Sequence, residues 1–457
     1  MRRLTKSLVV SLLALTARAV LARYKPRIVM VTGSVGKTST KDAVAAALGA
    51  RFLVRGSEKS FNSEFGVPFT VLGVGNPWED PVAWLLVARR ALGLLLLPNH
   101  YPNLLVLEVG ADAPGDLAKI LKIARPDLVV VTRLPEIPVH VEFYTTPEAV
   151  REEEFSPAYA LPPDAPLVVS SDDAFALEMA ARVPVRLVTY GTSESATVHL
   201  EDIGWDLDGM RAVVAAAGER AEVAVKGSVG RAQLLPIAAA IAAARALEVP
   251  FAEAVAAVAS YEPPAGRGRL FAGVLGSTLI DDSYNSSPIA VEEALETLAT
   301  FPIDVPAKRR NTRRQGRREE LGAPTDAVGI TRHGSRRGRR VAVLGDMLEL
   351  GRYSVMEHER IGAHVAKKAD MLVAVGIRAK RLAAAAVEAG MSEEQVMMFD
   401  DSRAASGALP ALLKEGDIVL VKGSQSIRME RVVEALLANP TDRSRLVRQE
   451  PAWLRKP

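Results

Sequence analysis

Residues 27–49 read RIVMVTGSVGKTSTKDAVAAALG: a strand-like apolar run, a turn with two glycines and a helix-like alanine-rich run. Glycines at this junction let backbone N–H groups approach an anion, and the N-terminus of a helix favours negative charge. Lys37 can reach the outer phosphates of a nucleotide, and Thr38 can offer its hydroxyl to Mg²⁺. A plain glycine turn is the alternative, but it gives the Lys-Thr pair no packing role. The predicted phosphate-binding residues are Gly33, Ser34, Val35, Gly36, Lys37, Thr38 and Ser39.

Short β-rich runs alternate with helix-like runs along most of the chain. One series extends from residue 27 to about 265, where PIAAAIAAARALEV and FAEAVAAVASY read as closing helices, and a second follows the linker-like PPAGRGR (263–269). Such alternation predicts an α/β protein with mostly parallel sheets and helices on both faces. The expected strands are RIVMV, LLVLEV, DLVVV, PLVVS and RLVTY in the first series and STLIDD, RVAVLG, MLVAVG and DIVLVKG in the second.

Composition narrows the class of protein. The 457 residues include no cysteine, which excludes disulfides, thiolate zinc sites and cysteine nucleophiles and fits a reducing compartment. Residues 308–340 hold twelve Lys or Arg and three acidic residues, a local net charge of +9 in a chain of net charge +3. The basic character therefore comes from one segment, and 304–340 is predicted to be a disordered insert because it is poor in large apolar residues.

The N-terminal segment, residues 1–26, is apolar and basic. Its apolar stretch at 8–22 is interrupted by Arg18, and a spanning helix needs about 20 mostly apolar residues. Three alternatives stay open: a helix packed on the body of the protein, an interfacial helix with its basic residues toward lipid headgroups, and a true span. The basic residues are Arg2, Arg3, Lys6, Arg18 and Arg23.

Six further segments, in this order, support one family resemblance over roughly residues 27–440. With the phosphate loop they are similar to the Mur ligase family, ATP-dependent amide-forming ligases of cell-wall synthesis, and within it to the type that adds D-alanyl-D-alanine to a UDP-muramoyl-tripeptide. The segments are KSFNSEFGVPFTVLG (59–73), LEVGADAPGDLAKI (107–120), PVHVEFYTTPEAV (138–150), IDDSYNSSP (280–288), VAVLGDMLELG (341–351) and VLVKGSQSIRMERVV (419–433).

The resemblance implies a fold and a chemical route. A central phosphate-loop domain at 27–265 would be followed by a Rossmann-like domain at 266–457, with ATP and Mg²⁺ between them. An acceptor carboxylate would become an acyl phosphate, and an amine would then displace phosphate, while cations offset the crowded negative charge. The implied catalytic residues are Lys37, Glu108, His140 and Glu154, and the implied Mg²⁺ ligands are Thr38, Glu108, His140 and Glu154.

Matched positions also imply contacts with the nucleotide and the substrates. Plainer alternatives are a linker role for Arg269, a turn at Asn285, a turn cap at Asp346, a solvated strand end at Glu108 and a core histidine at His140. The implied nucleotide contacts are Arg269, Asn285 and Asp346, and the implied substrate contacts are Asn62 and Lys422.

Three departures from the family pattern stand out. The family carries a carbamylated lysine shortly after the histidine segment, where this chain reads EAVREEEFS with Glu154 at the matching position. We expect Glu154 to replace the carbamate, the alternative being a solvated acidic helix face. Only 31 residues precede Thr32, so the family's UDP-binding domain is expected to be missing. Serine stands at 287 where the family often has a second asparagine, and VGRAQLLPIAAA (229–240) lacks the His-Asn pair usual in the family. These differences predict weaker nucleotide affinity.

The leading expectation is therefore an ATP- and Mg²⁺-dependent ligase for a muramoyl-peptide-like acid and a D-Ala-D-Ala-like amine. We expect a monomeric cytoplasmic protein at the inner face of the membrane, in contact with it through residues 1–24, and no specific nucleic-acid partner. Three alternatives remain: a ligase for a different acid and amine, a degenerate nucleotide-binding protein without turnover, and a nucleic-acid or membrane-surface protein that uses the basic segment at 308–340.

Overall fold

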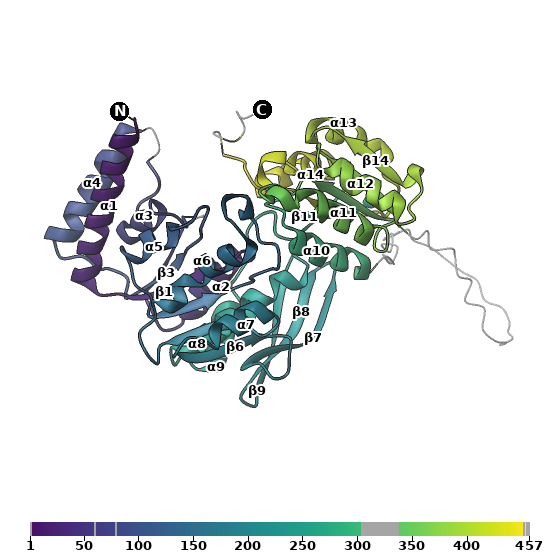
Figure 1. The fold of residues 1–457 in the computed structure, drawn as a ribbon. Coiled ribbons are helices and arrows are strands. Elements are labelled where there is room, and N and C mark those ends of the chain that lie inside the picture. The colour runs from purple at the N-terminus through teal and green to yellow at the C-terminus, as the bar shows by residue number, and fades with distance from the viewer. Residues whose placement is uncertain (1, 59–60, 78–79, 303–337, 451–452, 454–457) are drawn as a thin grey trace, which may run out of the picture.

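Two β-sheets, each covered by helices, form the two lobes of the protein (Figure 1). The computed structural model describes residues 2–58, 61–77, 80–302, 338–450 and 453. The predicted disordered insert at 304–340 lies outside the described residues except for its last three positions.

The first sheet has nine strands in the order β2-β3-β1-β4-β5-β6-β7-β8-β9. The strands from β2 to β7 pair in parallel, and β7, β8 and β9 pair antiparallel. The expectation of a mostly parallel sheet is confirmed. The bounds are β1 Arg27–Thr32, β2 Val54–Gly56, β3 Leu104–Glu108, β4 Leu128–Val131, β5 Pro166–Ser170, β6 Arg186–Gly191, β7 Val198–Asp206, β8 Gly209–Ala216 and β9 Glu219–Lys226.

Alternate side chains of β1 serve the two faces of this sheet, as the period of two in a strand requires. Val29 and Val31 belong to the apolar cluster under α2, α8 and α9, whereas Ile28 and Met30 belong to the cluster under α1, α3 and α5. A strand buried on both faces reads as an unbroken apolar run, which made it easy to predict. The helices of this lobe are α1 Arg2–Tyr24, α2 Lys37–Leu48, α3 Gly66–Leu72, α4 Pro81–Leu96, α5 Asp116–Leu121, α6 Pro147–Tyr159, α7 Ala174–Ala180, α8 Leu235–Ala246 and α9 Phe251–Val258.

The antiparallel strands β7 to β9 were not predicted. In β7 and β9 buried side chains alternate with more exposed ones, and in β9 only Val223 and Val225 are buried, whereas β8 is buried at six of its eight positions. Such strands lack a continuous apolar run, and the glycines, alanines and glutamates between 198 and 226 have weak β propensity.

The second sheet has six strands in the order β10-β11-β15-β12-β13-β14. Only β10 pairs antiparallel, so this lobe has the parallel α/β pattern that the sequence predicted. The elements are β10 Arg269–Ala272, β11 Thr278–Asp282, α10 Pro288–Thr300, β12 Arg340–Gly345, α11 Ser354–Val365, β13 Met371–Val375, α12 Ala379–Glu388, β14 Val396–Phe399, α13 Ser402–Leu412, β15 Ile418–Lys422 and α14 Glu430–Leu436.

The N-terminal helix α1 packs on the first lobe. Leu13, Ala17 and Val20 are buried at helical spacing, and the helix lies against α3 and α4. Among the described residues no helix is long and apolar enough to cross a membrane. The structure thus has the packed helix, whose other face, with Leu8, Leu12 and Leu15, is exposed.

Helix α8 is buried almost all round. Every residue from Leu235 to Ala246 except Arg245 is buried, and the helix contacts α2, α9 and four strands of the first sheet. Alanine suits this position because its small side chain lets a helix approach its neighbours closely without loss of rotamer freedom.

We expect Ala239→Leu to lower the free energy of unfolding by about 1–3 kcal/mol, because the added atoms must overpack the space around a fully buried residue. The matched control is Ala256→Leu on an exposed position of α9, which should change it by less than about 0.5 kcal/mol. Urea denaturation of the three proteins is the measurement. Equal stability of the two variants would contradict this packing.

Candidate active site

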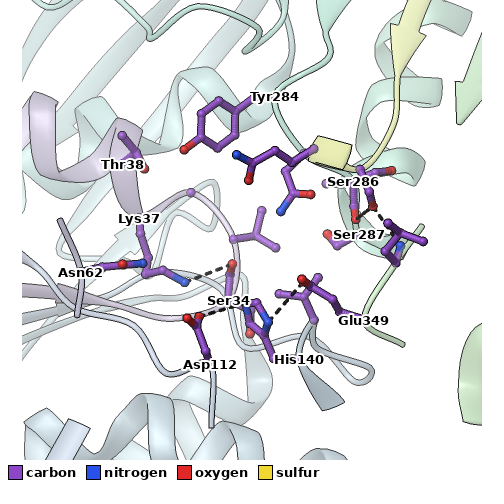
Figure 2. Close-up of a pocket in the computed structure, with 18 of the residues that line it drawn as sticks. Ser34, Lys37, Thr38, Asn62, Asp112, His140, Tyr284, Ser286, Ser287 and Glu349 are labelled. Atoms are coloured by element: carbon purple, nitrogen blue, oxygen red, sulfur yellow. Dashed lines mark hydrogen bonds and ion pairs between the residues drawn. The ribbon is translucent and has the colours of Figure 1, made fainter. Parts of the chain in front are cut away.

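A cavity of about 480 Å³ lies between the two lobes (Figure 2). The first lobe contributes the phosphate loop, the end of β3 and the loop after β4, and the second contributes the segment after β11 and two loops beyond β12 and β15. Side chains from distant parts of the chain therefore meet in one place. The lining residues include Ser34, Val35, Gly36, Lys37, Thr38, Asn62, Glu108, Asp112, His140, Arg267, Tyr284, Asn285, Ser286, Ser287, Glu349, Ser424 and Trp453.

The phosphate loop needs both of its glycines. Gly33 has φ 116° and Gly36 has φ 89°, in the region that side chains other than glycine avoid. A Cβ at Gly33 would also lie 2.4 Å from the Thr132 hydroxyl. Gly36 directly precedes Lys37, where α2 begins, so the free N–H groups of the helix start face the cavity and can receive an anion.

Lys37 and the buried Glu154 form an ion pair at this loop. The Lys37 ammonium donates to the Gly33 carbonyl, and its Nζ lies 3.8 Å from Glu154 Oε1. The other oxygen of Glu154 accepts a hydrogen bond from the Ser34 hydroxyl, and its backbone carbonyl accepts one of 2.5 Å from the Thr32 hydroxyl. Glu154 is 0% exposed, so the alternative of a solvated acidic helix face is wrong. Burial raises the pKa of Glu154, and this effect exceeds the lowering by the positive charge of Lys37.

Thr38 and Glu108 form a second polar pair, at the end of β3. The Thr38 hydroxyl donates to Glu108 Oε1 at 3.1 Å, while Oε2 is buried without a hydrogen-bond partner in the described part of the chain. Burial raises the pKa of Glu108, which Lys41 and Lys37 counteract. A solvated strand end is excluded because Glu108 is 2% exposed. A hydroxyl and a carboxylate with a free oxygen fit a hard divalent cation.

His140 lies on a loop after β4 and contacts both lobes. Its Nδ1 is 3.2 Å from Glu349 Oε2 in the second lobe, and its Nε2 is 3.7 Å from Asp112 Oδ1 in the first. The backbone at His140 is left-handed, with φ 65°. The contacts are with carboxylates, so a core histidine is not what the structure has.

The four predicted metal ligands do not form one cluster. Thr38 and Glu108 face each other, His140 faces Asp112 and Glu349, and Glu154 is bonded to the phosphate loop. Over the described residues, no group of three or more His, Asp or Glu side chains is arranged to hold a metal ion. The residues present fit a cation at Thr38 and Glu108. Glu154 is hydrogen-bonded to the hydroxyls of Thr32 and Ser34 under the loop, and its role as a Mg²⁺ ligand stays a prediction.

Arg267 lies two residues before the predicted nucleotide contact Arg269, at the break between the lobes, and lines the cavity. Its guanidinium lies 4.2 Å from the centre of the Tyr284 ring. Arg269 belongs to β10, lies 3.9 Å from Glu262 and is absent from the cavity lining. The residue of this pair placed to meet a phosphate is therefore Arg267.

Asp346 and Lys422 support the cavity from outside its lining. Asp346 Oδ1 accepts a 2.7 Å hydrogen bond from the Ala379 backbone N–H, so this carboxylate caps the start of α12 as the turn-cap alternative expected. Lys422 Nζ lies 2.6 Å from Asp282 Oδ2 and donates to the Asn285 carbonyl at 3.0 Å. It is 1% exposed and fixes the loop that presents Asn285. Ser39 lines a smaller neighbouring cavity.

Asn62 and Asn285 line the main cavity as predicted, but several other lining residues were not singled out. Asp112, Glu349 and Ser424 lie in segments already matched to the family, LEVGADAPGDLAKI, VAVLGDMLELG and VLVKGSQSIRMERVV. Their polar side chains within those segments were the available signal. Trp453 carried no such signal, because it lies beyond the last matched segment.

The buried carboxyl of Asp281, below the Asn285 loop, gives stability a pH dependence. Its Oδ1 accepts hydrogen bonds from the Ser283 N–H at 3.1 Å and from the Ser283 hydroxyl at 2.5 Å. Burial raises the pKa of Asp281 from 3.8 to about 6. The folded protein therefore binds this proton more tightly than the unfolded chain, and its contribution to stability is present below pH 3.8 and is lost as the pH rises to about 6.

We expect the free energy of unfolding to fall by at most about 3 kcal/mol from this group between pH 4 and 6. Asp281→Asn should remove that part of the fall. The exposed Asp208→Asn is the matched control and should keep it. Urea midpoints at pH 4, 5, 6 and 7 measure the effect, and identical pH profiles for both variants would contradict it.

Comparisons with known proteins agree with this geometry. Residues 91–244 match the family model of the Mur ligase middle domain, and residues 326–425 match that of the Mur ligase glutamate ligase domain. The chain is 30% identical over 432 residues to the UDP-N-acetylmuramoyl-tripeptide–D-alanyl-D-alanine ligase of Mycobacterium tuberculosis (strain CDC 1551 / Oshkosh), covering 91% of this chain and 73% of that protein.

A second relative and a solved structure extend the match. The enzyme of the same name from Bacillus subtilis (strain 168) is 24% identical, with 93% of this chain and 79% of that protein covered. The crystal structure of MurF ligase from Thermotoga maritima in complex with ADP superposes with a TM-score of 0.71 at 26% identity, covering 93% of this chain and 83% of that one.

Proposed function

This chain belongs to the Mur ligase family, and from that premise we propose that it is an ATP-dependent ligase that adds D-alanyl-D-alanine to a UDP-muramoyl-tripeptide in peptidoglycan synthesis. The observation that carries the proposal is the cavity between the lobes, where the phosphate loop faces Arg267, Asn285 and Ser424. The similar ligase from Thermotoga maritima was crystallised with ADP, which supports ATP as the nucleotide here.

The phosphate loop would hold the polyphosphate through its backbone N–H groups and Lys37. ATP supplies the phosphoryl group that turns the acceptor carboxylate into an acyl phosphate, and the dipeptide amine then displaces phosphate. Mg²⁺ would be held by the Thr38 hydroxyl and by Glu108, whose Oε2 has no hydrogen-bond partner among the described residues. The protein's own contribution is to place the reacting groups and to exclude water when the lobes close.

Two side chains of the first lobe that line the cavity can orient the acceptor and the amine. Asn62 lies beside Lys37, as its Nδ2 would be 3.1 Å from a Cβ added at Gly110 and the Lys37 Cε would be 3.3 Å from it. His140 lies between Asp112 and Glu349 and can hold or pass a proton near the incoming amine. We propose Asn62 as an acceptor contact and His140 as a proton-handling residue.

The remaining assignments are also proposals. The domain limits are 27–265 and 266–457, so that each domain holds one sheet. The protein is placed in the cytoplasm as a monomer, a location that the absence of cysteine fits, with α1 against the inner face of the membrane.

The first experiment measures ADP release with Mg-ATP, UDP-muramoyl-tripeptide and D-Ala-D-Ala, leaving out each component in turn. Release that needs both substrates and yields an amide product supports the proposal. Lys37→Ala should lower kcat/KM by about 10²–10³-fold, because it removes a cation from the transferring phosphate. Lys226→Ala, on exposed β9, is the control and should leave it unchanged. Release of ADP with a different acid and amine would instead favour the ligase of other specificity.

Substitutions of Glu154 test whether the site has lost its catalytic activity. We expect Glu154→Ala to lower kcat by about 10²-fold through misplacement of Lys37, and the isosteric Glu154→Gln to lower it less, because the amide still accepts the Ser34 hydrogen bond. Glu154→Lys should be inactive without added bicarbonate, since a second cation would then lie beside Lys37. An inactive native protein and an active Glu154→Lys variant would favour a degenerate nucleotide-binding protein.

A further inference from the structure

Helices α1 and α4 carry an unusual share of the exposed apolar side chains. Among the described residues, nine of the nineteen large apolar side chains that are exposed lie on these two helices or directly after α4. The two helices lie side by side along one edge of the first lobe, on the side away from the second lobe (Figure 1). The nine are Leu8, Leu12, Leu15, Val82, Leu85, Leu86, Leu92, Leu96 and Leu97.

Each helix has an inner seam and an outer apolar face. On α1 the outer face follows helical spacing through Leu8, Leu12 and Leu15, which are 60–71% exposed. On α4 it follows the same spacing through Leu85, Leu92 and Leu96, which are 58–71% exposed. The inner sides of the helices are formed by other residues, among them Ala17 of α1 and Val87 of α4, which are buried in the apolar cluster of the first lobe.

The pair is held firmly to the lobe. Tyr24 donates a 2.9 Å hydrogen bond to the Leu94 carbonyl and stacks on Tyr101 with the ring centres 4.4 Å apart. Arg23 donates to the Leu97 carbonyl at 3.3 Å. Only Lys25 and Pro26 separate α1 from β1, the strand that carries the phosphate loop. A surface that binds these helices would therefore hold the catalytic lobe as well.

The charged residues of the two helices are all basic. Residues 1–41 and 81–107 contain no Asp or Glu, whereas residues 1–27 contain seven Lys or Arg and α4 contains Arg89 and Arg90. Arg18 and Arg89 are exposed beside the leucines. The face is thus apolar and cationic, which is the combination that binds a lipid surface with anionic headgroups.

We propose that the outer faces of α1 and α4 together dock on a bilayer that contains anionic lipids. The leucines would enter the boundary between headgroups and acyl chains, and the guanidinium groups would meet lipid phosphates. A second copy of the chain fits less well as the occupant, because it would bring two cationic faces together, whereas the cores of protein interfaces are depleted of charge. Neither helix spans the membrane in this arrangement.

The test is flotation of the full-length protein with phosphatidylcholine vesicles, with and without 30% phosphatidylglycerol. We expect binding to the anionic vesicles, weakened in 0.5 M NaCl, and at least about tenfold weaker binding of the double variant Leu12→Glu/Leu85→Glu. Leu207→Glu and Ile377→Glu, at exposed apolar positions elsewhere, are the matched controls and should bind as the wild type does. Thermal unfolding and ADP release should be unchanged in all variants, because none of these side chains lies in the core or lines the cavity.

Other outcomes would overturn the proposal. No binding to anionic vesicles rejects it outright, and equal binding to neutral and anionic vesicles removes the role of charge. Light scattering that finds a dimer, separated by the double variant, would make a second copy the occupant. A deletion of residues 304–337 that abolishes binding would move the site to that basic segment.

Discussion

The parallel pairing of β1 between β3 and β4 is the constraint on which the rest of the site depends. Parallel neighbours end at the same edge of a sheet, so the phosphate loop after β1, Glu108 at the end of β3 and the His140 loop after β4 must emerge together. The register pairs Val31 with Glu108 directly. Because β1 is covered by helices on both faces, the edge cannot shift without disturbing two apolar clusters at once.

Burial of charge gives this edge its chemical character. Glu108 and Glu154 are almost wholly removed from solvent, and burial raises the pKa of each. The positive charge of Lys37 opposes this rise in the pKa of both carboxyl groups. Lys37 Nζ donates to the carbonyl of Gly33, a hydrogen bond for which a bound anion would compete. A nucleotide bringing negative charge, together with a cation for the free oxygen of Glu108, would complete the pairing of charges that the protein leaves open.

The second lobe acts through one well-braced segment. Tyr284 and Asn285 are presented to the cavity by a loop that Lys422 holds from below and Arg448 holds from the side, through the Ser283 carbonyl at 3.1 Å. Arg267 stacks on Tyr284, so the turn before β10, at the break between the lobes, also contacts this loop. His140 and Glu349 make the opposite contact between the lobes. The cavity is therefore bounded by fixed elements on both sides, which suits a site that must orient several charged groups.

The sequence by itself determined the phosphate loop, the two α/β series and the family, because GSVGKT and the buried strands are local patterns that fix local structure. It could not predict β7 to β9, because their apolar pattern is weak and they form strands by pairing with β6 and with one another. It also could not predict the hydrogen-bond partners of Asp346, Lys422 and Glu154. Each of these residues has a charged side chain of the type that also contacts ligands. Only the hydrogen-bond partners in the folded protein show that these three side chains bond to neighbouring protein groups. Tertiary structure decided that Arg267 rather than Arg269 lines the cavity, and that Glu154 bonds to Ser34 instead of facing His140. Which side chains meet depends on how helices and strands pack in three dimensions. The number of residues between two positions does not determine the distance between their side chains.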